Sequence, residues 1–146
     1  MIWLLRHGDA EDEAADDASR RLTDEGERQA RAAGAALATL GAEIGACLTS
    51  PKLRARDFAL IACAELGIEV EETEALSGGD FEPVDLEAAA GTDRDVLLVG
   101  HEPDFSRAIQ ATTGARIQLK KGGLAAIDGA KLVALLRPTE LRVIAD

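Results

Sequence analysis

Aromatic residues are scarce in this sequence, which has three Phe, one Trp and no Tyr among its 146 residues. A folded core must therefore be built from Leu, Val, Ile and a large number of Ala side chains. With 47% hydrophobic and 29% charged residues, the composition is that of a globular protein and not of a disordered chain. A chain of this length can bury most of its apolar surface, and we expect residues 1–146 to form a single domain.

Long apolar runs are absent too. No segment approaches the roughly 20 apolar residues of a membrane span, and the apolar start of the chain reaches Arg6 too early for a signal-peptide core. We therefore expect a cytoplasmic protein without a membrane partner. Cysteine is limited to Cys47 and Cys63, which lack CxxC spacing and lie in apolar segments, so we expect buried free thiols.

Positive charge is the third shortage. Lys and Arg total 16 against 27 Asp and Glu, so the formal net charge is −11. A field of this sign repels nucleic acid, and no basic stripe with interleaved aromatic residues overcomes it. We expect no nucleic-acid partner. The acidic residues concentrate in segments 9–17 and 69–74, which we interpret as solvated surface, the first of them as a mobile loop.

Strand-like and helix-like segments alternate along the first two thirds of the chain. Residues 2–5 and 95–99 are short apolar runs typical of buried strands. Thr23 is expected to cap one helix, and Ser50 to cap another with Pro51 at its first position. Further elements are expected as a short strand around Val70 and helices over residues 81–90 and 105–113.

The pattern changes after residue 114. Residues 116–119, 124–127 and 131–136 are predicted as short strands, and the Asp128-Gly129 pair predicts a tight hairpin turn. The fold class that follows is α/β. We expect one mixed sheet, mainly parallel with an antiparallel C-terminal part, covered by helices on both faces.

The two histidines of the chain both follow predicted buried strands. His7 follows residues 2–5, and His101 follows residues 95–99. A third strand end, within residues 48–54, adds Arg54. Ligands of open α/β sheets collect at the carboxyl ends of the parallel strands. If these strands are neighbours, Arg6, His7, Arg54 and His101 converge on one rim.

Two guanidinium groups and two imidazoles form a pocket that attracts anions. One arginine guanidinium can donate to two phosphate oxygens at once, and the expected helix N-termini after Ser50 and His101 add backbone N–H donors. A neutral imidazole in such a pocket is a nucleophile that can form a covalent bond to phosphorus. We expect neither metal nor cofactor, because the arginines would repel a cation. Taken singly, His101 is equally consistent with a structural strand-end histidine. We interpret Arg56 as helix surface, and Lys120 and Lys121 as solvated residues of a hairpin tip, with steering of an anionic substrate as the alternative.

Four segments together resemble the histidine phosphatase superfamily, and its small SixA-type phosphohistidine phosphatases in particular. The segments are residues 5–10 (LRHGDA), 20–26 (RRLTDEG), 49–55 (TSPKLRA) and 98–103 (LVGHEP). The resemblance runs over nearly the whole chain and implies a phosphoglycerate mutase-like fold. It also implies that His7 is the phosphorylated nucleophile, that Arg6 and Arg54 bind phosphate, and that His101 contacts the phosphoryl group.

The chain departs from the superfamily pattern at the proton donor. Larger members carry a Glu or Asp for this role in a mid-chain insertion that is missing here. The nearest candidates are Asp80, Glu82 and Glu74, followed by Asp85 and Glu87. Phe58 also replaces a usual Thr, and the role of Asp9, directly after the RHG motif, stays open between orienting His7 and lying in the loop.

These observations predict a metal-independent phosphohistidine phosphatase. Phosphohistidine needs less help from a general acid than an ester does, and a short chain suits a phosphorylated side chain presented by a partner protein. The expected partners are a phosphohistidine protein and inorganic phosphate or other oxyanions in the pocket. Two alternatives stay open: a small-molecule phosphomonoesterase of the same superfamily, and a catalytically silent module that binds phosphate or a phosphoprotein.

Overall fold

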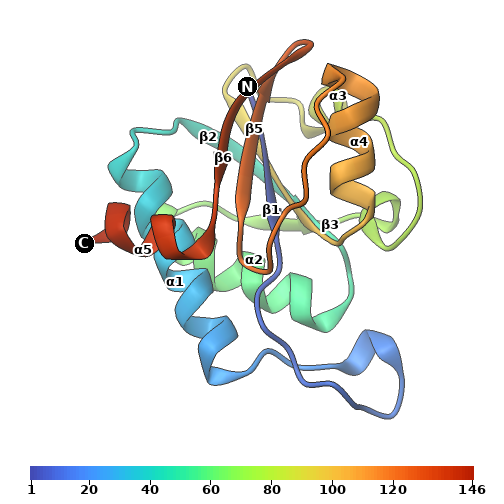
Figure 1. The fold of residues 1–146 in the computed structure, drawn as a ribbon, viewed down its shortest axis with the longest axis vertical. Coiled ribbons are helices and arrows are strands. Elements are labelled where there is room, and N and C mark those ends of the chain that lie inside the picture. Colours follow the sequence, from blue (N-terminus) through green and yellow to red (C-terminus); the bar gives the residue numbers. More distant parts are fainter.

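Six strands form one mixed sheet in the computed structural model, which describes residues 1–146 (Figure 1). Four of them lie parallel in the order β3-β2-β4-β1, and β5 and β6 continue the sheet antiparallel beyond β1. This arrangement confirms the predicted fold class. The strands are β1 (Ile2–Arg6), β2 (Ile44–Thr49), β3 (Val70–Glu72), β4 (Asp95–Gly100), β5 (Leu124–Asp128) and β6 (Lys131–Leu136).

Helices cover both faces of the sheet, as predicted. Helices α1, α2 and α5 pack on one face, and α3 and α4 pack on the other (Figure 1). The helices are α1 (Asp24–Thr39), α2 (Leu53–Leu66), α3 (Pro83–Ala90), α4 (Asp104–Thr113) and α5 (Pro138–Ala145), with 3-10 turns η1 (Asp17–Ser19) and η2 (Glu74–Leu76).

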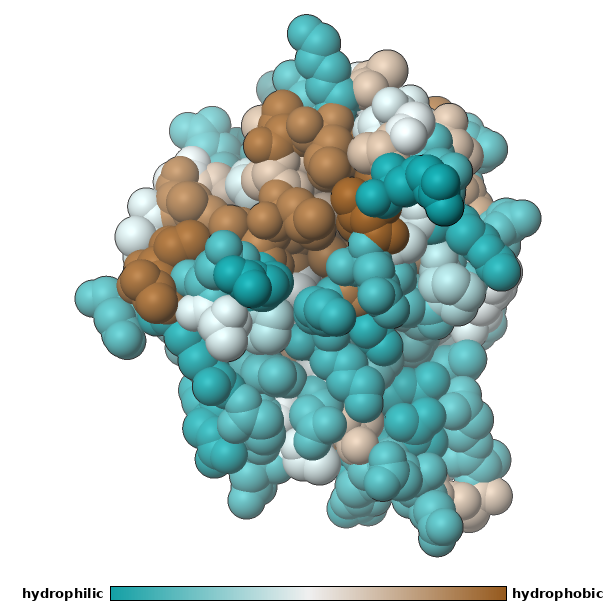
Figure 2. All heavy atoms as spheres, viewed as in Figure 1, coloured by the Kyte–Doolittle hydropathy of each residue, from teal (hydrophilic) through white to brown (hydrophobic).

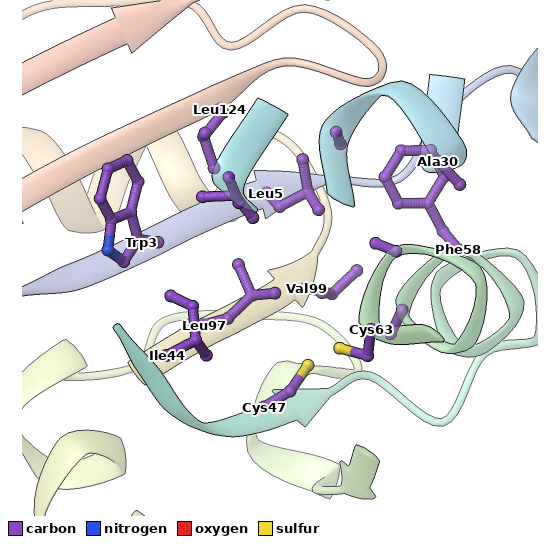
Figure 3. Close-up of a cluster of buried hydrophobic side chains, with 14 of the residues drawn as sticks. Trp3, Leu5, Ala30, Ile44, Cys47, Phe58, Cys63, Leu97, Val99 and Leu124 are labelled. Atoms are coloured by element: carbon purple, nitrogen blue, oxygen red, sulfur yellow. The ribbon is translucent and has the colours of Figure 1, made fainter. Parts of the chain in front are cut away.

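The core consists of two apolar layers, one on each side of the sheet. Alternate residues of β1 point to opposite faces, so Trp3 and Leu5 enter the layer under α1, α2 and α5, whereas Ile2 and Leu4 enter the other. The first layer is rich in alanine, which lets the helices lie close to the strands. The sulfur atoms of Cys47 and Cys63 face each other within this layer (Figure 3), and both residues are buried free thiols, as predicted.

Apolar and polar side chains occupy different parts of the surface. Figure 2 shows hydrophobic atoms gathered over β5 and β6, where Val133 and Leu135 are exposed, and a hydrophilic lower half around η1. The lower half is the end at which β1 finishes (Figure 1). No helix of the structure has the length and apolar character that crossing a membrane requires.

Helix boundaries follow the predicted caps in one case and depart from them in another. The Thr23 hydroxyl accepts the Gly26 N–H at 3.1 Å, so α1 begins where the sequence predicts. Helix α2 begins at Leu53, and the prediction that Ser50 caps it is wrong, because Lys52 holds the cap position. The Ser50 hydroxyl instead lies within the cluster of polar side chains at the strand ends, where it contacts His101.

The prediction of a strand over residues 116–119 is also wrong. The backbone of Leu119 is bonded to side chains and not to a neighbouring strand: its N–H lies 3.3 Å from Ser106 Oγ, and its carbonyl accepts Arg6 Nη1 at 2.9 Å. Helix α5 lies in a C-terminal segment for which the sequence analysis predicted no element. Its Leu141 is buried against the first core layer, which supplies the stabilisation that a helix of eight residues needs.

Candidate active site

The ends of β1, β4 and β2 meet at one edge of the sheet. Arg6 is in register with Gly100, and the His7 N–H donates to the Gly100 carbonyl at 3.1 Å. On the other side of β4, the Ser50 N–H donates to the Val99 carbonyl at 3.0 Å. The residues that follow the three strands are therefore neighbours in space although they lie far apart in the sequence.

A cavity of about 230 Å³ opens at this edge, and no hydrophobic residue lines it. All four residues predicted to form the site, Arg6, His7, Arg54 and His101, contribute to its wall. The imidazole rings of His7 and His101 lie edge to face, with 5.2 Å between their centroids. The full lining consists of Arg6, His7, Arg20, Lys52, Arg54, Ser77, Gly78, His101, Glu102, Asp104 and Lys121.

Hydrogen bonds determine which nitrogen of His7 can act as a nucleophile. Nδ1 lies 2.8 Å from the Gly8 carbonyl oxygen. Because a carbonyl only accepts, Nδ1 carries the proton, and the lone pair of the neutral ring is on Nε2. Arg54 Nε donates to this Nε2 at 3.3 Å. The reactive nitrogen therefore faces a guanidinium inside the cavity.

The surroundings of His7 keep its ring neutral. Burial, together with the positive charges of Arg54 and Arg6, lowers the pKa of His7 to about 4, although the Gly8 hydrogen bond opposes these effects. The side chain is only 6% exposed. At neutral pH, Nε2 therefore carries no proton, and its lone pair can attack phosphorus once a phosphoryl oxygen replaces it as the acceptor of the Arg54 Nε–H.

His101 is held by Ser50. His101 Nε2 lies 2.8 Å from Ser50 Oγ, which also accepts the Lys52 N–H at 3.2 Å. In the tautomer in which the Ser50 hydroxyl donates to Nε2, the proton of the neutral His101 ring is on Nδ1. This Nδ1 is buried without a partner. Burial, together with the charges of His7 and Arg54, lowers the pKa of His101 to about 3.

Arg6 offers a second unsatisfied donor. Its Nη1 donates to the Leu119 carbonyl, which fixes the side chain, while its Nε is buried without a partner. Burial lowers the pKa of Arg6, and Glu102 partly offsets this effect. Buried donors without a partner are rare because each costs about 1–3 kcal/mol. Arg6 Nε and His101 Nδ1 are thus suited to an anion that enters the cavity.

Arg54 reaches the cavity from the first turn of α2, and its side chain is 7% exposed. Besides the contact with His7, its Nη1 donates to the Asp17 carbonyl at 2.7 Å and its Nη2 to Asp17 Oδ2 at 3.2 Å. Asp17 is exposed, as the interpretation of segment 9–17 as solvated surface predicts, but its contact with Arg54 was not predicted. Arg56 lies outside the cavity, as predicted.

Comparisons with known proteins agree with this geometry. Residues 2–95 match the sequence pattern of the histidine phosphatase superfamily (branch 1). The chain belongs to this superfamily. An uncharacterized protein of Picosynechococcus sp. is 37% identical over 134 residues, which span 84% of this chain and 81% of that protein.

Solved structures of the histidine phosphatase superfamily share the fold. The protein histidine phosphatase SixA, complexed with tungstate, is 25% identical with a TM-score of 0.81, over 96% of this chain and 98% of that one. A phosphoserine phosphatase from Entamoeba histolytica, in complex with 3-phosphoglyceric acid, is 14% identical with a TM-score of 0.75, over 96% and 98% of the two chains. The small single-domain architecture of this chain is that of SixA-type members of the superfamily.

None of the predicted proton donors, Asp80, Glu82 and Glu74, lines the cavity. The two carboxylates that do are Glu102 and Asp104, which the sequence analysis did not single out. Glu102 accepts the Ser106 N–H at 2.8 Å and the Ser106 hydroxyl, so it is committed to the start of α4. The carboxylate of Asp104 makes neither a hydrogen bond nor an ion pair with another residue. Its position three residues after His101 was the only sequence signal that could have indicated it.

The cavity wall also contains three cationic side chains that the sequence did not indicate as site residues. Arg20, Lys52 and Lys121 line it, although Lys121 was interpreted as a residue of the hairpin tip. Asp9 does not contact His7: its carboxylate accepts the Thr23 hydroxyl at 2.8 Å and lies 3.9 Å from Lys121 Nζ. No group of three or more His, Cys, Asp or Glu side chains is arranged to hold a metal ion.

Close packing explains why a glycine follows His7. A Cβ atom at this position would lie 2.4 Å from Gln29 Oε1 and 2.8 Å from Phe58 Cε2. The Gln29 amide is itself in use, because its Oε1 accepts the Asp9 N–H at 2.8 Å. Any larger residue would force the Gln29 amide or the Phe58 ring to move, and a shift of Gln29 would break its bond to the Asp9 N–H. Phe58, the residue that departs from the superfamily pattern, is fully buried and acts in this packing.

Proposed function

We propose that this protein is a phosphohistidine phosphatase that works through a phosphorylated His7. The observation that carries the proposal is the cavity, which is small, has no apolar lining and holds the unprotonated His7 Nε2 beside Arg54. Pockets for small molecules are larger, roughly 300–1,000 Å³, and mostly apolar. This cavity suits a phosphoryl group whose carrier stays outside, such as a side chain of a partner protein in the cytoplasm.

The reaction divides into two displacements at phosphorus. In the first, the His7 Nε2 lone pair forms a bond to phosphorus as the bond to the substrate imidazole breaks, and that imidazole takes up a proton from solvent. In the second, water attacks the phosphoryl group, the bond to His7 Nε2 breaks, and inorganic phosphate leaves. Nδ1 keeps its proton on the Gly8 carbonyl throughout, so His7 returns to its starting tautomer.

Cationic groups and N–H donors take the place of a metal ion in this scheme. Arg6, Arg54 and His101 provide donors for the oxygens of the phosphoryl group, whose charge is spread in the transition state. Two of these donors, Arg6 Nε and His101 Nδ1, have no partner in the protein. Binding the phosphoryl group satisfies both of them, and this supports a metal-independent mechanism.

One observation favours a second candidate, a phosphomonoesterase acting on a small substrate. An alcohol leaving group needs a proton, which is worth about 10²–10⁴ in rate. Asp104 lines the cavity with a carboxyl group that has no hydrogen-bond partner, so it is available to supply that proton. The 3-phosphoglyceric acid complex of the phosphoserine phosphatase shows that this fold accommodates small phosphorylated acids.

A comparison of substrates distinguishes the proposed function from this second candidate. We would compare kcat/KM for a peptide carrying one phosphohistidine, prepared with potassium phosphoramidate, with kcat/KM for phosphoglycerate and p-nitrophenyl phosphate. We expect the peptide to be favoured over phosphoglycerate by about 10²-fold or more, because the cavity has no group committed to protonating the leaving oxygen of an ester. A preference for phosphoglycerate that Asp104→Asn removes would establish the second candidate instead. Tungstate binding without turnover of any substrate would indicate a silent binding module.

A further inference from the structure

Asp17 holds the end of Arg54 that points away from the nucleophile. The Asp17 carbonyl accepts Nη1 at 2.7 Å, and the Asp17 carboxylate accepts Nη2 at 3.2 Å. The remaining hydrogen bond of the guanidinium runs from Nε to His7 Nε2 at 3.3 Å. One planar group thus connects the acidic segment to the reacting atom.

The planarity of the guanidinium makes this connection directional. Its N–H groups have fixed directions in one plane, so holding Nη1 and Nη2 also determines where Nε points. Asp17 supplies every protein hydrogen bond of this guanidinium except the one to His7. Loss of the Asp17 carboxylate would leave Nη2 without a partner, and only the main-chain carbonyl of residue 17 would still hold that end of the guanidinium.

Asp17 is itself held in place. Lys52 Nζ lies 3.4 Å from Oδ2, and Arg20 Nη1 lies 3.1 Å from Oδ1. The preceding residue, Asp16, accepts the Ser19 N–H at 3.0 Å and closes the 3-10 turn on which Asp17 lies. The small loss of hydration raises the pKa of Asp17, but hydrogen bonds from Arg20 and Arg54 outweigh it and lower this pKa to about 2.

We infer that Asp17 is a positioning residue that acts through Arg54 and keeps its guanidinium beside His7 Nε2, where it can donate to the phosphoryl group that Nε2 receives. The inference rests on the phosphatase activity proposed above and is independent of the choice of substrate. It assigns a function to a segment that composition alone marks as solvated surface. The physical effect is preorganisation, because a displacement of about 1 Å in a positioned group costs up to about 10²-fold in rate.

A double-mutant cycle tests whether Asp17 acts through Arg54. Asp17→Ala, Arg54→Ala and the double variant would be compared by kcat/KM for p-nitrophenyl phosphate and by calorimetric binding of tungstate. Asp17→Ala removes the carboxylate that accepts Nη2 and keeps the main-chain carbonyl that accepts Nη1. We expect it to lower kcat/KM and the affinity for tungstate by about tenfold in the wild-type background and by less than about twofold in the Arg54→Ala background. Asp17→Asn, which keeps an oxygen acceptor for Nη2, should restore part of the loss.

Asp12→Ala is the matched control. Asp12 is an exposed acid of the same segment that makes no hydrogen bond or ion pair, so its loss changes the net charge equally and should leave both readouts unchanged. Thermal unfolding of each variant verifies that it is folded. An equal loss in both Arg54 backgrounds would overturn the inference, as would tighter tungstate binding by Asp17→Ala, which would mean that the carboxylate competes with the anion.

Failure of the proposed function gives a different result. If wild type turns over no phosphorylated substrate, the phosphatase proposal fails, but the tungstate arm of the cycle still measures whether Asp17 and Arg54 are coupled. Coupled losses of binding in that case would support the positioning role of Asp17 at an anion site without catalysis. Independent losses would refute it.

Discussion

Replacing Arg54 with alanine should nearly abolish catalysis, whereas replacing Arg56 should not, although both arginines lie on the first two turns of the same helix. Arg54 is 7% exposed and donates to His7 Nε2, so its charge acts on a bound anion with little screening by solvent. A charge-assisted hydrogen bond to a buried anion is worth about 1.5–3 kcal/mol. Its loss corresponds to about 10- to 150-fold in kcat/KM, since each 1.4 kcal/mol is tenfold.

Arg56 is the control within the same helix. Its side chain is 43% exposed, with Nη2 at 3.6 Å from Asp57 Oδ1 and Nη1 at 3.9 Å from Glu72 Oε1. Exposed ion pairs of this kind contribute about 0–1 kcal/mol to stability, and neither pair reaches the cavity. Arg56→Ala should therefore change kcat/KM by less than about threefold.

The fold should tolerate Arg54→Ala. Asp17 would keep Arg20 and Lys52 as partners, so no buried charge is left without compensation. We would measure kcat/KM for p-nitrophenyl phosphate and the Kd of tungstate for both variants, with thermal unfolding as a check that they are folded. The reasoning is refuted if Arg54→Ala retains a third of wild-type kcat/KM, or if Arg56→Ala is the more damaging change.

Three further predictions concern the nucleophile, pH and metals. His7→Ala should remove turnover, and wild type treated with a phosphoryl donor should carry an acid-labile, alkali-stable phosphate that His7→Ala lacks; retained turnover would exclude the covalent mechanism. Because the folded pKa of His7 is lowered to about 4, kcat/KM should fall as pH drops through about 4 rather than at the unperturbed value near 6.5. Between about pH 4 and 6.5, His7 binds more protons in the unfolded state than in the folded state. The free energy of unfolding should therefore decrease as pH falls from about 6.5 to 4. Extensive chelation should leave activity intact, and recovery of a lost activity by added Mg²⁺ or Zn²⁺ would contradict the proposed mechanism.

Local patterns in the sequence were sufficient for the strands that end at the site and for four of the residues that line it. The apolar runs at residues 2–5 and 95–99, each followed by histidine, predict buried parallel strands with polar side chains at their carboxyl ends. The structure brings Arg6, His7, Arg54 and His101 together at that edge. The reason is that the alternation of side chains along a strand is a local property, and that parallel strands end on the same side of a sheet.

Only the tertiary structure decided how the polar groups are paired. Residues 116–119 have the composition of a strand, but the Arg6 and Ser106 side chains bond the backbone of Leu119 instead. Ser50 has the signature of a helix cap, yet its hydroxyl binds His101 across 51 sequence positions.

The acidic segment is the clearest case of this limit. Asp17 reads as solvated surface in the sequence, and it holds Arg54 in the fold. Such partners are chosen by distance and direction between residues far apart in the chain. Neither periodicity nor propensity encodes these distances and directions. The four central residues of the site could therefore be named from the sequence, whereas their hydrogen-bond network required the assembled sheet.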